Sequence, residues 1–105
     1  MNKVKDLDIG LIVLNAGIMN VGYFDKKSGR QLQEMMDVNA YSLCILLKMF
    51  LPQLDRRCNS EKTSGVCITS SLAGWATTGG NTTYHATKVF VNYLHRALHK
   101  EIQQA

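Results

Sequence analysis

The chain has 105 residues, of which 46% are apolar and 19% are charged, so it is long enough for one soluble globular domain and no more. Its net charge of +4 comes from basic residues that are scattered along the chain, which excludes a run of Lys and Arg that would follow a nucleic-acid backbone. The most apolar stretch, AYSLCILLKMFL, is shorter than the ~20 residues of a membrane span, and the polar start MNKVKDLD does not resemble a signal peptide.

The first predicted element is a strand within residues 8–17, DIGLIVLNAG. Its unbroken Leu-Ile-Val-Leu run lacks alternation and is typical of a strand buried on both faces of a parallel sheet. Residues 17–29 are punctuated by glycine and become polar, which predicts a loop, and Ser28 is suited to cap a following helix. Residues 30–51 carry apolar side chains at helical spacing and contain neither Gly nor Pro, which predicts a long helix.

This first predicted helix is apolar on all sides from Ala40 onward. Such a helix is expected to pack against its own sheet and against a second surface, such as another subunit. Pro52 predicts a kink or an end, with one last turn that reaches Arg57. The adjacent Met35 and Met36 are interpreted as core packing.

Three further elements complete the predicted order. Residues 57–65 form a polar turn, VCITSS (66–71) a second buried strand, and residues 72–83 a loop before a long helix over 84–104. Strand, helix, strand and helix in this order predict one right-handed βαβ unit and a further helix, from an α/β protein with a parallel sheet. Two strands cannot cover the apolar faces of both helices, so the sequence predicts part of such a sheet.

Other reactive side chains predict no metal centre. Cys44 and Cys67 lie in apolar runs and are interpreted as buried, reduced thiols, which fits a reducing compartment. His95 and His99 are four apart on the predicted helix but have no evident third ligand, so they are interpreted as surface histidines. His85 is interpreted as pocket lining or surface, without a catalytic role.

The stretch YHATK places Tyr84 and Lys88 four apart, on one face of the second predicted helix. A free phenol ionises near pH ~10, and a neighbouring ammonium favours the phenolate. Such a pair can pass a proton to or from an oxygen that interconverts between carbonyl and alcohol. By itself, however, the spacing favours a simpler interpretation, a packed tyrosine beside a solvated lysine.

Three other features strengthen the chemical interpretation. TSSLAG follows the second predicted strand and places Ser70 and Ser71 at the carboxyl edge of the sheet, where open α/β sheets bind ligands. LNAG (14–17) ends the first strand at the same edge. Asn39 lies inside an otherwise apolar helix, where a polar amide needs a partner. Two interpretations of Trp75 stay open: it borders a substrate pocket, or it caps the core.

A strand ending N-A-G, a helix with V-N, a strand ending S-S-x-A-G and a Y-x-x-x-K helix follow one another in this sequence. Together they make residues 8–104 resemble the middle of a short-chain dehydrogenase/reductase, most closely the hydroxysteroid dehydrogenase and very-long-chain 3-oxoacyl-CoA reductase branch. The resemblance implies that residues 1–105 form a single, partial NAD(P)-binding domain. Its fold would be part of a Rossmann-type, doubly wound parallel sheet, without the N-terminal Gly-rich unit (T-G-x-x-x-G-x-G) and the C-terminal strands.

The resemblance also implies roles for individual residues. Tyr84 would be the catalytic acid/base, and Lys88 would favour its ionised form and hold the nicotinamide ribose. Ser71, thirteen residues before the tyrosine, would position the substrate carbonyl. Asn39 would order a proton-relay water. The cofactor, NADP or NAD, would contact Asn15, Ala16, Gly17, Tyr84 and Lys88, and no metal is implied.

The implied function is that of a segment of an NAD(P)(H)-dependent oxidoreductase that interconverts a ketone and a secondary alcohol, with a steroid or 3-oxoacyl substrate. Because no pyrophosphate-binding turn is found in the sequence, we expect the isolated chain to be inactive. The alternative is a non-catalytic, truncated copy that serves only as a dimerisation module. Expected partners are a hydrophobic ketone or alcohol and a second copy, bound through helices 30–56 and 84–103, but no nucleic acid. The expected location is the cytoplasm or the cytosolic face of the endoplasmic reticulum.

Overall fold

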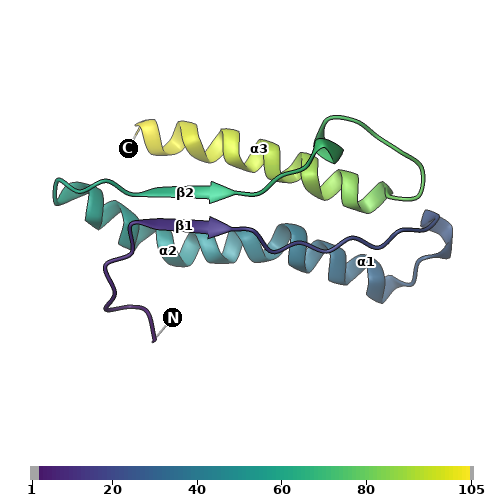
Figure 1. Ribbon diagram of the computed structural model, residues 1–105, viewed down its shortest axis with the longest axis horizontal. Coiled ribbons are helices and arrows are strands. Elements are labelled where there is room, and N and C mark those ends of the chain that lie inside the picture. The colour runs from purple at the N-terminus through teal and green to yellow at the C-terminus, as the bar shows by residue number, and fades with distance from the viewer. Residues whose placement is uncertain (1–2, 105) are drawn as a thin grey trace.

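Two parallel strands form the sheet of this protein (Figure 1). The computed structural model describes residues 3–104, which occupy an elongated slab of 51 × 29 × 16 Å. The strands are β1 (Leu11–Leu14) and β2 (Gly65–Ile68), paired in a register that places Leu14 opposite Ile68. The carboxyl ends of both strands therefore lie at the same edge of the sheet, as predicted.

A continuous helical segment, Gly29–Asn59, leads from the first strand to the second. It consists of α1 (Gly29–Met36), a π-helical turn (Asp37–Tyr41) and α2 (Ser42–Asn59). The predicted cap at Ser28 is confirmed. The Ser28 hydroxyl accepts the backbone N–H of Gln31, whose side chain accepts the backbone N–H of Ser28 in return.

Helix α2 passes through Pro52 and ends at Asn59, two residues beyond the predicted last turn. Proline removes one backbone hydrogen bond, and the helix continues because Leu54, in the next turn, is buried. By length and composition alone, Gly29–Asn59 is long and apolar enough to cross a membrane. In this structure the segment is instead a core helix, with Leu43 and Leu47 buried against the sheet.

The second long helix, α3 (Thr82–Gln104), begins two residues earlier than predicted. The carbonyl of Asn81 already accepts the N–H of His85 and so closes the first turn. Between β2 and α3 the chain makes one 3₁₀ turn (Leu72–Gly74) and then arches over the first half of α3 (Figure 1).

The core lies between the sheet and the two helices α2 and α3. Alternate strand residues, beginning with Ile12 and Leu14, face the helices, and the intervening Leu11 and Val13 are 62% and 55% exposed. The prediction that both strands are buried on both faces is therefore wrong for residues 3–104, because α2 and α3 cover only one face. The cluster comprises Ile12, Leu14, Leu43, Leu47, Leu51, Val66, Ile68, Val91, Leu94 and Leu98.

Three positions that the sequence assigned to the core, or left open to it, are exposed to solvent. Cys67 lies on the uncovered face and is exposed, while Cys44 is half-buried, so the prediction of a buried thiol fails at Cys67. Of the two adjacent methionines, Met35 is buried and Met36 is exposed. Trp75 is 73% exposed and so does not cap the core of the described residues.

Candidate functional site

Tyr84 and Lys88 lie on one face of α3, in its first two turns, as their spacing predicted. The Lys88 Nζ atom is 5.5 Å from the centroid of the Tyr84 ring. Lys88 is only 6% exposed, and within residues 3–104 it forms no ion pair. A buried ammonium without a carboxylate partner is costly, and its position over a tyrosine ring is therefore unusual for a lysine that only serves the fold.

Asn39 is buried at the π-helical turn, and its amide reaches out of the helix to the loop after β1. Its Oδ1 accepts the backbone N–H of Ile18, and its Nδ2 donates to the carbonyl of Ile18, both over 2.8 Å. The same Nδ2 lies 3.3 Å from the Oγ1 of Thr87. Asn39 thus joins three segments, which explains the polar amide in an apolar helix and the widened turn that carries it.

Gly17 lies beside both of these side chains. A Cβ atom placed on Gly17 would be 3.5 Å from Lys88 Nζ and 3.5 Å from Asn39 Oδ1. Its neighbours Asn15 and Ala16 are exposed, and Asn15 Oδ1 accepts the Thr69 hydroxyl over 2.8 Å, which ties the ends of the two strands together. The structure therefore brings Gly17, Asn39, Lys88 and Tyr84 to one place, at the carboxyl edge of the sheet.

The two serines after β2 are both engaged. The Ser71 Oγ atom accepts the backbone N–H of Ala73 over 3.1 Å and caps the 3₁₀ turn. The Ser70 hydroxyl donates to Asn92 Oδ1 on α3, over 2.6 Å. Ser71 is half-buried, and its own O–H donates to no described residue, which leaves that hydrogen available to a ligand.

Three further residues hold these parts together, and of these the sequence singled out only His85. Thr87 is 1% exposed. Its hydroxyl donates a hydrogen bond to the carbonyl of Tyr84 and accepts one from Asn39 Nδ2, so Thr87 anchors the π-helical turn to α3. His85, predicted as pocket lining or surface, is buried and binds the backbone of the loop before α3. Gly74 lies so close to α3 that a Cβ there would be 2.5 Å from Asn92 Nδ2. A buried threonine inside Y-x-x-x-K was a usable signal, because it needs a partner just as Asn39 does.

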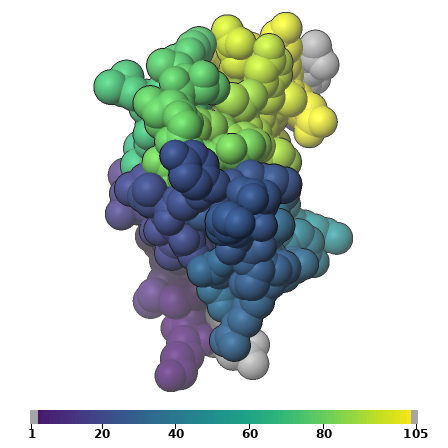
Figure 2. Space-filling view, turned by 90° about the vertical axis from the view of Figure 1, so that its right-hand side faces the viewer, coloured from purple at the N-terminus to yellow at the C-terminus, as the bar shows by residue number. Residues whose placement is uncertain are grey.

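Figure 2 shows the end of the molecule at which these segments meet, with the loop and helix of residues 17–36 packed directly against the start of α3. A backbone hydrogen bond from Gly22 N–H to the carbonyl of Gly80 joins the two loops at this end. In the loops that follow the two strands, Met19, Val21, Leu72 and Trp75 are each more than half exposed. These loops therefore carry apolar side chains that are open to water.

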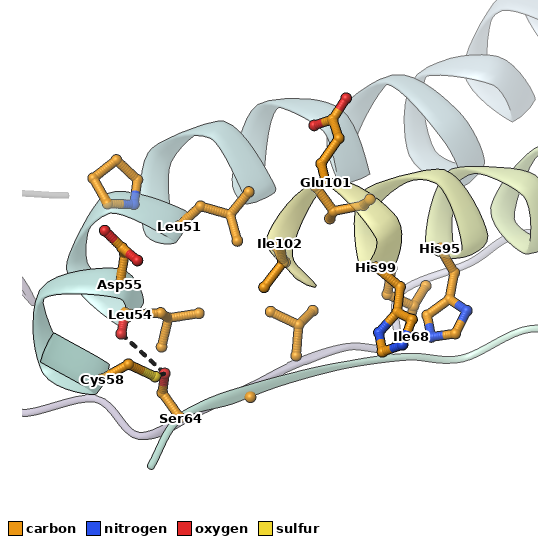
Figure 3. Close-up of a pocket in the computed structure, with 14 residues that line it drawn as sticks. Leu51, Leu54, Asp55, Cys58, Ser64, Ile68, His95, His99, Glu101 and Ile102 are labelled. Atoms are coloured by element: carbon orange, nitrogen blue, oxygen red, sulfur yellow. Dashed lines mark hydrogen bonds between the residues drawn. The ribbon is translucent and has the colours of Figure 1, made fainter. Parts of the chain in front are cut away.

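A separate cavity lies away from these residues. It has about 850 Å³ and lies between the C-terminal halves of α2 and α3, where Leu51 and Ile102 point toward one another above β2 (Figure 3). None of the predicted site residues lines it. His95 and His99 stack at its border, 6.2 Å apart, and within residues 3–104 no three His, Cys, Asp or Glu side chains are placed to hold a metal. A smaller hollow of about 440 Å³ is bordered by Trp75, β2 and α3.

The sequence and the fold match known proteins throughout. The family model for short chain dehydrogenases matches residues 1–105. Very-long-chain 3-oxoacyl-CoA reductase from Anas platyrhynchos is 33% identical over 107 residues, which cover 93% of this chain and 31% of that protein. Hydroxysteroid dehydrogenase-like protein 1 from Gallus gallus is 33% identical over 101 residues, covering 93% of this chain and 29% of that protein.

Among solved structures, an NADH-dependent reductase in complex with NAD has a TM-score of 0.82 and 26% identity, and the match covers 91% of this chain and 41% of that one. The chain thus spans about a third of the length of the curated relatives it matches. The α/β, Rossmann-type fold predicted from the sequence is confirmed, with two of its parallel strands present. On the family model and the structural match together, this chain belongs to the short-chain dehydrogenase family.

Proposed function

We propose that this chain is the proton-transferring segment of an NAD(P)(H)-dependent oxidoreductase that interconverts a ketone and a secondary alcohol. The observation that carries the proposal is the Lys88 ammonium, which is buried without an ion-pair partner among residues 3–104 and lies 5.5 Å from the centre of the Tyr84 ring. It places a positive charge beside the half-buried Tyr84 side chain, which carries a transferable proton on its hydroxyl. Tyr84 then gives its proton to a carbonyl oxygen, or takes one from an alcohol.

The residues beside Tyr84 fit a nicotinamide cofactor. Lys88 Nζ is a donor suited to ribose hydroxyl groups, and the adjacent Gly17 has no side chain to block an approach. Asn15 and Ala16 present an exposed turn at the strand end, where ligands of such sheets bind. A bound nicotinamide would supply the hydride that ketone reduction requires. The relative solved with NAD supports this choice of cofactor, and both NADP and NAD remain within the proposal.

Two other side chains have supporting roles in this proposal. The free O–H of Ser71 donates to the substrate carbonyl and orients it toward Tyr84. The amide of Asn39 is committed to Ile18 and Thr87, so the contribution that its geometry supports is to hold the Gly17 turn beside Lys88. The relay water assigned to Asn39 by family resemblance stays a prediction.

The proposed substrate is hydrophobic, of the steroid or 3-oxoacyl type. The names of the relatives, a 3-oxoacyl-CoA reductase and a hydroxysteroid dehydrogenase-like protein, support this class. So do the exposed apolar side chains Met19, Val21, Leu72 and Trp75 in the loops after the two strands, because an apolar substrate would cover side chains that are otherwise open to water.

The proposed function is tested by comparing the turnover of the native protein with that of a variant in which only Tyr84 is replaced. The protein that contains these residues is incubated with NADPH or NADH and a panel of steroid and 3-oxoacyl ketones, and oxidation of the cofactor is followed. Tyr84→Phe should abolish turnover, whereas Tyr93→Phe, which changes an exposed tyrosine of the same helix, should not. Equal rates for the native protein and Tyr84→Phe would refute the proposal. Residues 1–105 alone are expected to show no turnover.

A second candidate function, a dimerisation module without catalysis, is favoured by a separate observation. Ile45, Leu46 and Met49 on α2 and Phe90 and Tyr93 on α3 are apolar or aromatic side chains that are 37–65% exposed. In this proposal a second copy covers them, through the helices 30–56 and 84–103. Size-exclusion chromatography with light scattering should then give a dimer, and Met49→Glu should shift it to a monomer. A native monomer at all concentrations would exclude the module.

We also propose a location in the cytoplasm or on the cytosolic face of the endoplasmic reticulum. Three thiols, Cys44, Cys58 and Cys67, are free, and two of them are exposed, which suits a reducing environment. Fractionation of cells that express a tagged protein would test it, and recovery with lumenal or secreted markers would contradict it.

A further inference from the structure

The side chain of His85 contacts the loop before α3. Its side chain is 8% exposed, although imidazoles on helices are more often at the surface. Its Nδ1 lies 2.8 Å from the carbonyl oxygen of Ala73. Its Nε2 accepts the backbone N–H of Thr78 over 3.1 Å and lies 3.2 Å from the Thr78 hydroxyl. One imidazole therefore holds both ends of a six-residue stretch.

These partners allow only one form of the ring. A carbonyl oxygen can only accept a hydrogen bond, so Nδ1 must carry the hydrogen that it donates to Ala73. A backbone N–H can only donate, so Nε2 must present its lone pair to Thr78. The neutral imidazole protonated at Nδ1 satisfies both contacts, and each other form loses at least one of them.

The stretch held by His85 is the one that follows Ser71. Gly74 lies against α3, where a Cβ would be 3.1 Å from the carbonyl oxygen of Lys88, and Trp75, the next residue, has 73% of its surface exposed. The loop joins Ser71 to the helix of Tyr84 and Lys88. Besides the contacts of His85, the Ser71 cap and the backbone bonds of the 3₁₀ turn hold its start, and the bond from Gly22 to Gly80 holds its end.

We propose that His85 is a positioning residue, which in its Nδ1-protonated form clamps the Ala73–Thr78 loop to α3 and so fixes Trp75 and Ser71 relative to Tyr84. The consequence for an apolar substrate, which Trp75 would border, rests on the proposed function. The clamp itself does not.

The chain contains a single tryptophan, and it lies inside the clamped loop, so its fluorescence reports on this loop alone. In the full chain, His85→Phe keeps a planar ring but neither hydrogen bond. We expect Trp75 to gain fast local motion, seen as a loss of residual anisotropy in a time-resolved decay, and the Thr78 amide to exchange its hydrogen about tenfold faster. His99→Phe, at an exposed position farther along the same helix and outside the hollow that Trp75 borders, is the matched control and should change neither value.

A variant that restores one of the two hydrogen bonds distinguishes a hydrogen-bonding role of His85 from a role in packing alone. In His85→Asn the side-chain NH₂ can take the place of Nδ1–H toward Ala73 but cannot reach Thr78. Trp75 anisotropy should then lie between those of the native chain and His85→Phe, while Thr78 exchange stays fast. Equal anisotropy and equal Thr78 exchange in the native chain and His85→Phe would overturn the proposal.

A further test uses the native chain and therefore does not depend on whether a variant folds. Nitrogen-15 spectra distinguish a pyrrole-type from a pyridine-type ring nitrogen, and His85 should show Nδ1 of the first type and Nε2 of the second. The reverse assignment would overturn the clamp even if every variant failed to fold. If the clamp holds but Tyr84→Phe retains turnover, the proposed function fails and the positioning of the loop stands.

Discussion

The amide of Asn39 pairs with both backbone groups of Ile18, with two hydrogen bonds of 2.8 Å. Ile18 follows the end of β1, where a strand partner is no longer available to its N–H and C=O. The side chain of a residue 21 positions later in sequence takes over that pairing from inside a helix. Asn39 thereby fixes the turn that carries Gly17, next to the Lys88 ammonium.

Asn39→Leu should therefore destabilise the fold. The leucine keeps the volume but leaves the N–H and C=O of Ile18, which are part-buried, without their partner, at a total cost of about 1–3 kcal/mol. Urea denaturation of the chain measures the change. Gln33→Ala, which removes an exposed amide from the same helical segment, is the control and should change stability by less than about 0.5 kcal/mol. Equal midpoints for Asn39→Leu and the native chain would contradict the role of the pair.

Tyr84→Phe should lower the rate of ketone reduction by about 10²–10⁴-fold in the active enzyme, because it removes only the transferable proton. The ring and its contact with Lys88 remain, so the melting temperature should stay within experimental error of the native value. Steady-state rates and thermal denaturation of the same preparations check both parts. A variant with near-native rate would show that the proton comes from another group.

Lys88→Met should change function and stability in opposite directions. The ammonium is 6% exposed and lacks an ion-pair partner among residues 3–104, so replacing it with an apolar group of similar length should stabilise the fold by about 1 kcal/mol. Cofactor affinity and rate should both fall, since the donor to the ribose and the charge beside Tyr84 are lost. Lys100→Met, at an exposed position of α3, should leave all three quantities unchanged. Unchanged affinity and rate in Lys88→Met would count against both of its roles.

Gly74→Ala should displace the loop before α3. The added Cβ would lie 2.5 Å from Asn92 Nδ2 and 3.1 Å from the carbonyl oxygen of Lys88, and the second contact is with backbone that cannot rotate away. Overpacking of this kind costs about 1–3 kcal/mol. Gly79→Ala is the matched control, because nothing lies within 4 Å of its Cβ. Denaturation midpoints that fall equally in both variants would show that the close approach at Gly74 is unimportant.

Asp8→Asn should lower stability at neutral pH only. A hydrogen bond from Lys62, the largest contribution, and one from Arg57 lower the pKa of Asp8 below its ordinary value of 3.8. A lowered pKa in the folded state means that the ionised group stabilises the fold above 3.8, and that this contribution is lost as the pH falls through the folded value. The difference in melting temperature between native and Asp8→Asn proteins should therefore shrink in acid. A difference independent of pH would contradict the assignment.

Periodicity and turn residues in the sequence were enough to predict the order of elements, because each depends on short-range patterns. The cap at Ser28 and the shared face of Tyr84 and Lys88 follow from spacings of three and four residues, and both are confirmed. The end of α2 at Asn59 lies two residues beyond the predicted last turn at Arg57, a difference that local patterns at a helix end do not resolve. Exposure of Cys67 was missed because a short strand does not reveal whether one or two of its faces are covered.

For the site, the sequence identified which residues are chemically unusual but not what they bind. Asn39 stood out as a polar group in an apolar helix, yet its partner Ile18 is in a distant loop and no pattern connects them. His85 was assigned to a pocket or the surface because its neighbour Tyr84 faces elsewhere, and the loop that covers it has no regular spacing. Contacts between side chains and irregular backbone of this kind become visible only in three dimensions.

The parallel pairing of β1 with β2 also sets an order of events during folding. Helical turns form on contacts between near neighbours within roughly a microsecond, whereas parallel strands must first close the long loop between them. In this chain that loop joins Asn15 to Thr69, which are 54 positions apart. Because the turn with Gly17 continues directly from β1, we expect its contact with Lys88 to form together with this closure or after it. A substitution that slows strand pairing would leave the helices intact and delay the appearance of cofactor binding.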